Sequence, residues 1–149
     1  MDFCSNVWGN CTKSELDMVY KLQKRSAHII FYASIDHPSK TLVRELKWFT
    51  IYDRTDFHKT VLLYNYLHGT APEYLQDLFR PFSTQYQLRS ISHGNLLAPK
   101  PRREQLKMSY QYSGTVLWNK FPLHVKSAEN VRVCKKRYHE HVCVSNTNR

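Results

Sequence analysis

The chain has 149 residues, of which 42% are hydrophobic, and a formal net charge of +10. This composition excludes a wholly disordered chain, and the length suits one domain with a modest core. Residues 1–79 carry nine basic and nine acidic side chains, whereas residues 80–149 carry thirteen basic and three acidic ones. This asymmetry indicates a polyanionic partner, nucleic acid first and an anionic membrane surface second, with a merely basic, solvated surface as an equal alternative.

The first expected helix follows the sequence TKSE at residues 12–15. Thr12 can accept a hydrogen bond from the amide of Glu15, while the Glu15 carboxylate can accept one from the Thr12 amide, which is the capping-box pattern. Behind this pair, apolar residues recur at helical spacing from Leu16 to about Phe31. The pattern predicts a long amphipathic helix.

Further helices are expected before residue 80. Ser39 is placed to cap a short helix over residues 41–48, and Asp53 is placed to cap the next one. Gly69 lies where a C-terminal residue with positive φ is expected. The sequence TAPEYLQDLF then restarts a helix, with Pro72 near its first position.

The helical pattern weakens from Arg80 to Leu106, where the sequence is polar and contains Pro99 and Pro101. We interpret residues 80–108 as an exposed basic connector, with a short β-hairpin near residues 95–109 as one option. Helical periodicity returns over Tyr110–Asn119 and over Ala128–Cys143.

These elements predict a mainly α fold: a small assembly of about five or six helices with an irregular basic connector. We expect a single domain over residues 1–149. It would comprise a charge-balanced helical half (1–79), the connector (80–108) and a basic helical half (109–149).

Catalytic chemistry is not expected. Polymerase and nuclease sites need carboxylates that converge on metal ions, but the sequence has no adjacent aspartates, and Asp53 and Asp56 are placed as helix-start residues. The four glycines are isolated, so no glycine-rich loop is available to hold a phosphate. We therefore predict no enzyme activity, no catalytic residue and no cofactor.

The stretch CKKRYHEHVC suggests a zinc site, because Cys134, His139, His141 and Cys143 fall within ten residues. On a continuous helix, however, Cys134 and His141 share one face, whereas His139 and Cys143 share another. The favoured interpretation is a basic helix with one apolar edge, and a zinc-dependent binding module remains the weaker alternative.

Two basic segments are the candidate nucleic-acid contacts. We expect them to bind phosphate groups without sequence choice, because no base-reading pattern is visible. Most aromatic residues between the segments, including Trp118, are expected to pack in the core. The candidate contact residues are Lys100, Arg102, Arg103 and Lys107 in the connector, and Arg132, Lys135, Lys136 and Arg137 near the C-terminus.

Seven short motifs occur once each, in this order, between about Phe3 and about Tyr138: WGNC, LQKR, LKW, YDR, LHGTAPEYL, PKPRRE and YSGTVLWN. In this combination the chain resembles the region downstream of the polymerase domain in jockey-like non-LTR retrotransposon reverse transcriptases. It departs from that pattern after LKW, where Phe49-Thr50 replaces the usual Leu-Pro. The resemblance implies non-catalytic helices beside the template–primer duplex, with the upstream polymerase domain as a missing partner.

Two functions follow as hypotheses. The first is a non-catalytic C-terminal fragment of a retrotransposon reverse transcriptase that contacts template–primer nucleic acid. The second is an independent helical protein-interaction module with a basic face. The first residues lack the pattern of a secretory leader, and no apolar run is long enough to span a bilayer. We therefore expect an intracellular protein, nuclear or cytoplasmic, with reduced cysteines and no membrane partner.

Overall fold

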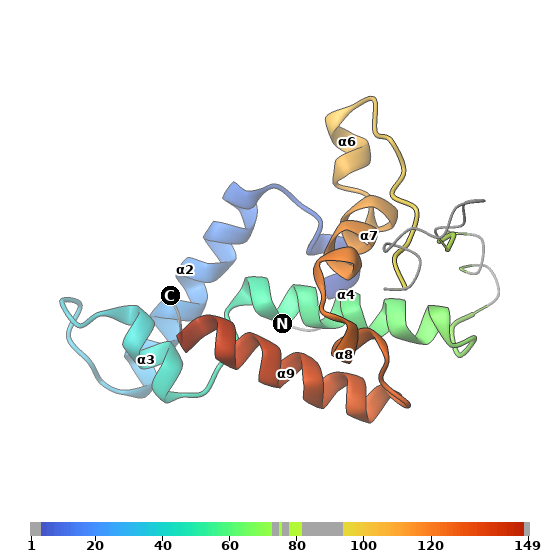
Figure 1. The fold of residues 1–149 in the computed structure, drawn as a ribbon. Coiled ribbons are helices and arrows are strands. Elements are labelled where there is room, and N and C mark those ends of the chain that lie inside the picture. The colour runs from blue at the N-terminus through green and yellow to red at the C-terminus, as the bar shows by residue number, and fades with distance from the viewer. Residues whose placement is uncertain (1–3, 73–74, 76–77, 82–93, 148–149) are drawn as a thin grey trace. The chain divides into compact units, whose positions relative to one another are not determined.

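The computed structural model describes residues 4–72, 75, 78–81 and 94–147. It confirms the mainly α prediction, because the described residues form eight helices and no named strand (Figure 1). Three of these helices have only four residues each, so the five longer ones agree with the predicted number. Residues 73, 74, 76 and 77 of the helix expected from Pro72, and residues 82–93 of the connector, lie outside the described residues.

The chain divides into two compact units, residues 1–56 and residues 57–149, which are described separately below. The division falls within one helix, α4 (Ile51–Leu67). The expectation of a single domain stays a prediction.

The first unit contains α1 (Ser5–Trp8), α2 (Lys13–Ile30), α3 (Ser39–Glu45) and the first turns of α4. The predicted capping box starts α2: Thr12 Oγ1 accepts a hydrogen bond from the Glu15 amide at 3.4 Å, and Glu15 Oε2 accepts one from the Thr12 amide at 2.8 Å. α2 and α3 pack together through the buried side chains Ala27, Leu42 and Val43. This packing forms the small core of the unit.

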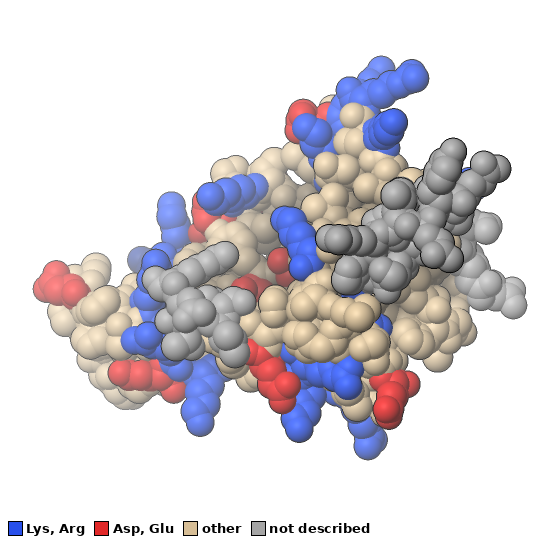
Figure 2. All heavy atoms as spheres, in the orientation of Figure 1, with Lys and Arg blue, Asp and Glu red and all other residues tan. Residues whose placement is uncertain are grey.

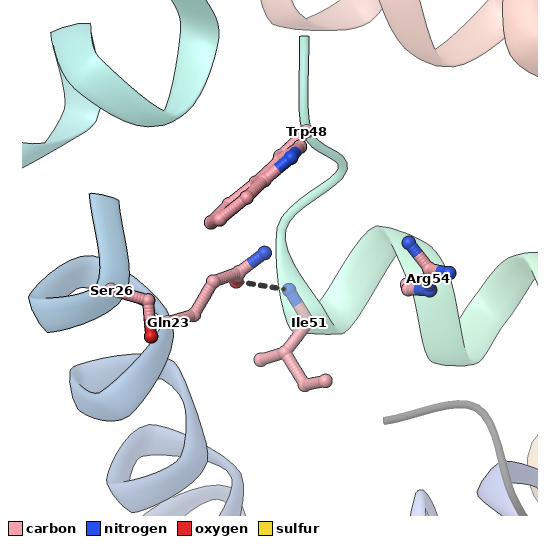
Figure 3. A pocket seen from close by; sticks show the side chains of 5 residues that line it. All are labelled: Gln23, Ser26, Trp48, Ile51 and Arg54. Atoms are coloured by element: carbon pink, nitrogen blue, oxygen red, sulfur yellow. Dashed lines mark hydrogen bonds between the residues drawn. The ribbon is translucent and has the colours of Figure 1, made fainter. Parts of the chain in front are cut away.

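The side chain of Gln23 fixes the start of α4 from α2. Its Nε2 donates to the carbonyl of Phe49 at 2.7 Å, and its Oε1 accepts from the amide of Ile51 at 3.1 Å (Figure 3). Thr50 caps the helix: its Oγ1 accepts a hydrogen bond from the Asp53 amide at 3.2 Å. The prediction that Asp53 caps this helix is therefore wrong, because α4 begins before it, at Ile51.

Beside Gln23 the first unit has a small hollow of about 230 Å³ (Figure 3). Its other lining residues are Ser26, Trp48, Ile51 and Arg54. Ligand pockets usually exceed about 300 Å³. The hollow is therefore small for a cofactor or drug-sized molecule.

The second unit contains the rest of α4, α6 (Glu104–Lys107), α7 (Tyr110–Lys120), α8 (Leu123–Lys126) and α9 (Val131–Thr147). Gly69 has φ +68°, as predicted for a residue that follows the end of α4. The core of the unit brings together residues from α4, α7, α9 and the segments that join the helices: Leu63, Tyr64, Phe79, Leu96, Trp118, Ala128 and Cys134.

Hydrogen bonds attach the described part of the connector to α7. The Asn119 side chain accepts from the amide of Leu96 at 2.8 Å and donates to the carbonyl of Leu96 at 2.9 Å. Trp118 Nε1 donates to the carbonyl of Gly94 at 3.0 Å. The predicted core position of Trp118 is confirmed, since its side chain is 3% exposed.

The optional hairpin near residues 95–109 does not form. Residues 94–109 contain no strand, α6 occupies Glu104–Lys107, and Leu96 forms only an isolated antiparallel bridge with Pro81. Pro99 and Pro101 explain the difference, because neither has an N–H group to donate to a strand ladder.

Candidate nucleic-acid interface

The connector presents three cations immediately before α6. Lys100, Arg102 and Arg103 are exposed, and within the described ranges no hydrogen bond or ion pair holds their side chains. We call these three residues the connector patch. Lys107 behaves differently, because its Nζ lies 2.6 Å from Glu104 Oε1, and this hydrogen bond raises the pKa of Lys107.

The outward face of α9 presents a second group of three cations, Arg132, Lys135 and Lys136. Their spacing of three and four residues puts them on the side opposite the buried residues Cys134 and Tyr138. No described residue forms an ion pair or hydrogen bond with these three side chains. We call them the helix patch.

Arg137 has a structural contact instead. Its Nη1 donates to the carbonyl of His124 at 2.5 Å, which joins α9 to α8. Its guanidinium is thus partly committed to the fold. The structure therefore separates the eight predicted contact residues into six cations in two patches and two, Lys107 and Arg137, with partners inside the protein.

The two patches do not form one continuous face. Within the second unit, α6 and α9 lie toward opposite ends of α7 (Figure 1). Basic atoms lie over α6 and again along α9, with acidic atoms beside both groups (Figure 2). A single ligand must therefore be long enough to pass α7 if it is to contact both patches.

A further cation, Lys126, belongs to the fold rather than to the surface. Its side chain is 9% exposed, and its Nζ donates to Asn95 Oδ1 at 2.7 Å and to the carbonyl of Asn119 at 3.4 Å. Desolvation lowers the pKa of Lys126, because burial penalises its charged form. Its role is to hold α8 against the connector.

The four-ligand zinc cluster considered from the sequence is not formed. α9 continues unbroken through Cys134, His139, His141 and Cys143, and no group of three or more possible metal ligands occurs in the described part of the chain. Cys134 is buried in the core, where desolvation raises the pKa of its thiol to about 11. His141 lies instead near the ring of Phe121, with ring centroids 5.8 Å apart.

Two of the three aromatic residues of α7, Tyr110 and Trp118, pack in the core rather than on an exposed stacking surface. The Tyr110 hydroxyl donates to the carbonyl of Lys59 at 3.1 Å, and burial raises its pKa. The Tyr110 ring packs edge-to-face against Phe79, with ring centroids 5.5 Å apart. Together with the buried Trp118, this packing makes α7 the spacer between the two patches.

Comparison with known proteins gives no relative: no protein-family model, no curated protein and no solved structure matches the chain. Of the helices described, none is both long enough and apolar enough to cross a bilayer.

Proposed function

We propose that the chain is a non-catalytic nucleic-acid-binding segment that contacts phosphate groups through the connector patch and the helix patch. The observation that carries this proposal is the pair of cation triplets in the second unit. Each triplet is exposed, and no described acidic side chain forms an ion pair with it, although Glu104 follows the first triplet and Glu129 and Glu140 flank the second. Cations outnumber the neighbouring acidic side chains in both segments, so each keeps a net positive field that a polyanion relieves.

Phosphate binding suits the residue types present. The arginine side chains, Arg102, Arg103 and Arg132, can each donate two parallel hydrogen bonds to a phosphate, while the lysines act as point charges. Neither patch has a recognisable base-reading sequence pattern, so the expected binding is independent of sequence.

The motif resemblance points to a parent for this activity. We propose that the chain is the C-terminal part of a retrotransposon reverse transcriptase, works inside the cell, in the nucleus or cytoplasm, and acts beside a template–primer duplex held by an upstream polymerase domain. The helical architecture and the basic surface of the second unit are compatible with that role. Catalysis would belong to the upstream domain.

The separation of the two patches favours one alternative. Each triplet could instead receive a short acidic segment of another protein, which would make the chain an independent helical interaction module. Salt dependence distinguishes the two, because binding to duplex nucleic acid releases condensed counterions along the whole contact. If six phosphates are neutralised, a plot of the logarithm of affinity against the logarithm of salt concentration should have a slope of about −5.

The test is fluorescence anisotropy with a labelled duplex over a salt series. Replacing Lys100, Arg102 and Arg103 by glutamine should reduce the steepness of the slope by about 3, and so should replacing Arg132, Lys135 and Lys136. The matched control replaces three exposed cations of the first unit, Lys21, Lys40 and Arg44, by glutamine. It causes the same loss of net charge. Equal weakening by the control would refute the assignment of the patches, and tighter binding to an acidic polypeptide than to the duplex would favour the alternative.

A further inference from the structure

The outward face of α9 also carries a paired thiol and imidazole. His139 and Cys143 are four residues apart and both exposed. This spacing places them one helical turn apart on the same side of the helix. Cys143 Sγ lies 3.4 Å from His139 Nδ1. The fold thus brings together two of the four residues of the zinc motif, and leaves Cys134 in the core.

This separation is close to the one that zinc requires. With zinc–sulfur and zinc–nitrogen bonds of about 2.3 and 2.0 Å and a tetrahedral angle, the ligating sulfur and nitrogen lie about 3.5 Å apart. The observed pair therefore needs only a small adjustment, which side-chain rotation in α9 can supply. The imidazole can present the Nδ1 lone pair when its proton is on Nε2.

We propose that His139 and Cys143 form one half of a tetrahedral zinc site, and that the same pair from a second copy of the chain forms the other half. Structural zinc takes four nitrogen or sulfur ligands. The described part of the chain places no third histidine, cysteine or carboxylate with this pair. A two-fold axis through the metal completes a two-sulfur, two-nitrogen set, and each Cys143 thiol releases its proton to the buffer on binding.

The helix patch opposes this association, because both copies carry Arg132, Lys135 and Lys136 on the same face as the pair. An antiparallel crossing of the two α9 helices at the metal limits the repulsion. At a rise of 1.5 Å per residue, the two Lys136 residues would then be about 15 Å apart along the helix axis. That distance exceeds the screening length of about 8 Å at physiological salt.

The sequence that follows Cys143 also favours this crossing. The cations that precede the pair would face the residues that follow Cys143 in the other copy. The sequence there, VSNTN, has no charged side chain before Arg149. Two basic helix patches therefore need not meet, and both stay accessible at the outer ends of the crossing.

Cobalt(II) titration and light scattering after size-exclusion chromatography test the site, with untagged chain, a phosphine reductant and no nucleic acid. We expect a tetrahedral cobalt–thiolate spectrum that saturates at one metal per two chains, and a doubled mass with zinc that returns to the monomer with chelator. Cys143→Ser and His139→Gln should abolish both effects, whereas Cys11→Ser and His141→Gln should retain them. Saturation at one metal per chain without a change in mass would overturn the proposal, and so would full metal binding by Cys143→Ser.

These outcomes are independent of the phosphate-binding proposal. The Cys143→Ser variant keeps every cation of both patches, so its duplex affinity in chelator should equal that of the wild type. Cys143 and His139 are exposed, whereas the control residues Cys11 and His141 are half-buried, so an unchanged circular dichroism spectrum is required of all four variants.

Discussion

Replacing Trp118 by alanine should cost the protein a large part of its stability. The indole is 3% exposed and lies in the core of the second unit. A tryptophan buries about 150–250 Å², which corresponds to about 4–6 kcal/mol at about 25 cal/mol per Å². Measured aromatic-to-alanine losses of about 3–5 kcal/mol agree with this range. We therefore expect the free energy of unfolding to fall by about 4 kcal/mol.

The same substitution also removes a hydrogen bond, which a second variant isolates. Trp118→Phe keeps an aromatic ring in the core but loses the donor to the carbonyl of Gly94. It should therefore cost about 1 kcal/mol for the hydrogen bond, plus a smaller amount for the void. The difference between the two variants then measures the packing of the ring.

Urea unfolding followed by far-ultraviolet circular dichroism gives both values without relying on tryptophan fluorescence. For a chain of this size, 4 kcal/mol corresponds to a decrease in melting temperature of about 10 °C. Trp48→Ala is the control, since Trp48 is 37% exposed and lies in the first unit. If Trp118→Ala destabilises the protein no more than Trp48→Ala does, the assignment of Trp118 as a core anchor is wrong.

Three further predictions concern single side chains. The hydrogen bond from the Tyr52 hydroxyl to the Asp17 carboxylate raises the pKa of Tyr52 from 10.0 to about 12. Between these two pH values the unfolded chain loses the Tyr52 proton while the folded chain keeps it. The free energy of unfolding should therefore fall as pH rises from about 10 to 12. Tyr52→Phe should flatten that fall, as urea midpoints across the interval will show. Burial raises the pKa of Cys134 to about 11, so iodoacetamide should alkylate exposed Cys143 well before Cys134 at neutral pH, which peptide mass spectrometry will resolve. Asn119→Ala leaves two backbone groups of the connector without their partners and should cost about 2 kcal/mol or more in urea unfolding.

Local sequence signals predicted two helix ends correctly and misplaced another, because Ser39, expected to cap a helix over residues 41–48, is the first residue of α3, which has no side-chain cap. The capping box at Thr12 and Glu15 is present, and Gly69 has the expected positive φ. Both features depend on residues close together in sequence. The start of α4 was misplaced although Thr50 and Asp53 give a local capping signal, a threonine three residues before an acidic residue. A second contact is not local, because Gln23, 28 residues away, accepts the hydrogen bond of the Ile51 amide. A side chain at that distance leaves no local signal.

The candidate interface shows the same limit. Composition identified the basic segments, and their spacing predicted the outward face of α9. Neither composition nor spacing showed that Arg137 would donate a hydrogen bond to the carbonyl of His124, or that Lys126 would be buried against Asn95. These contacts depend on how α8 lies between α7 and α9 in the folded unit. The distance between the two patches likewise depends on α7, whose core packing separates them.

The net charge therefore overestimates the number of cations that are available to bind a polyanion. The second half of the chain carries all of the +10 excess, yet part of it stabilises the fold itself. Lys126 holds the connector, Arg137 joins two helices, and Lys107 is neutralised by Glu104. A phosphate could reach buried Lys126 only by breaking its hydrogen bonds, whereas for Lys107 and Arg137 it would compete with an existing contact, and both effects offset part of the gain from counterion release. The salt dependence of binding should consequently follow the six patch residues rather than the composition.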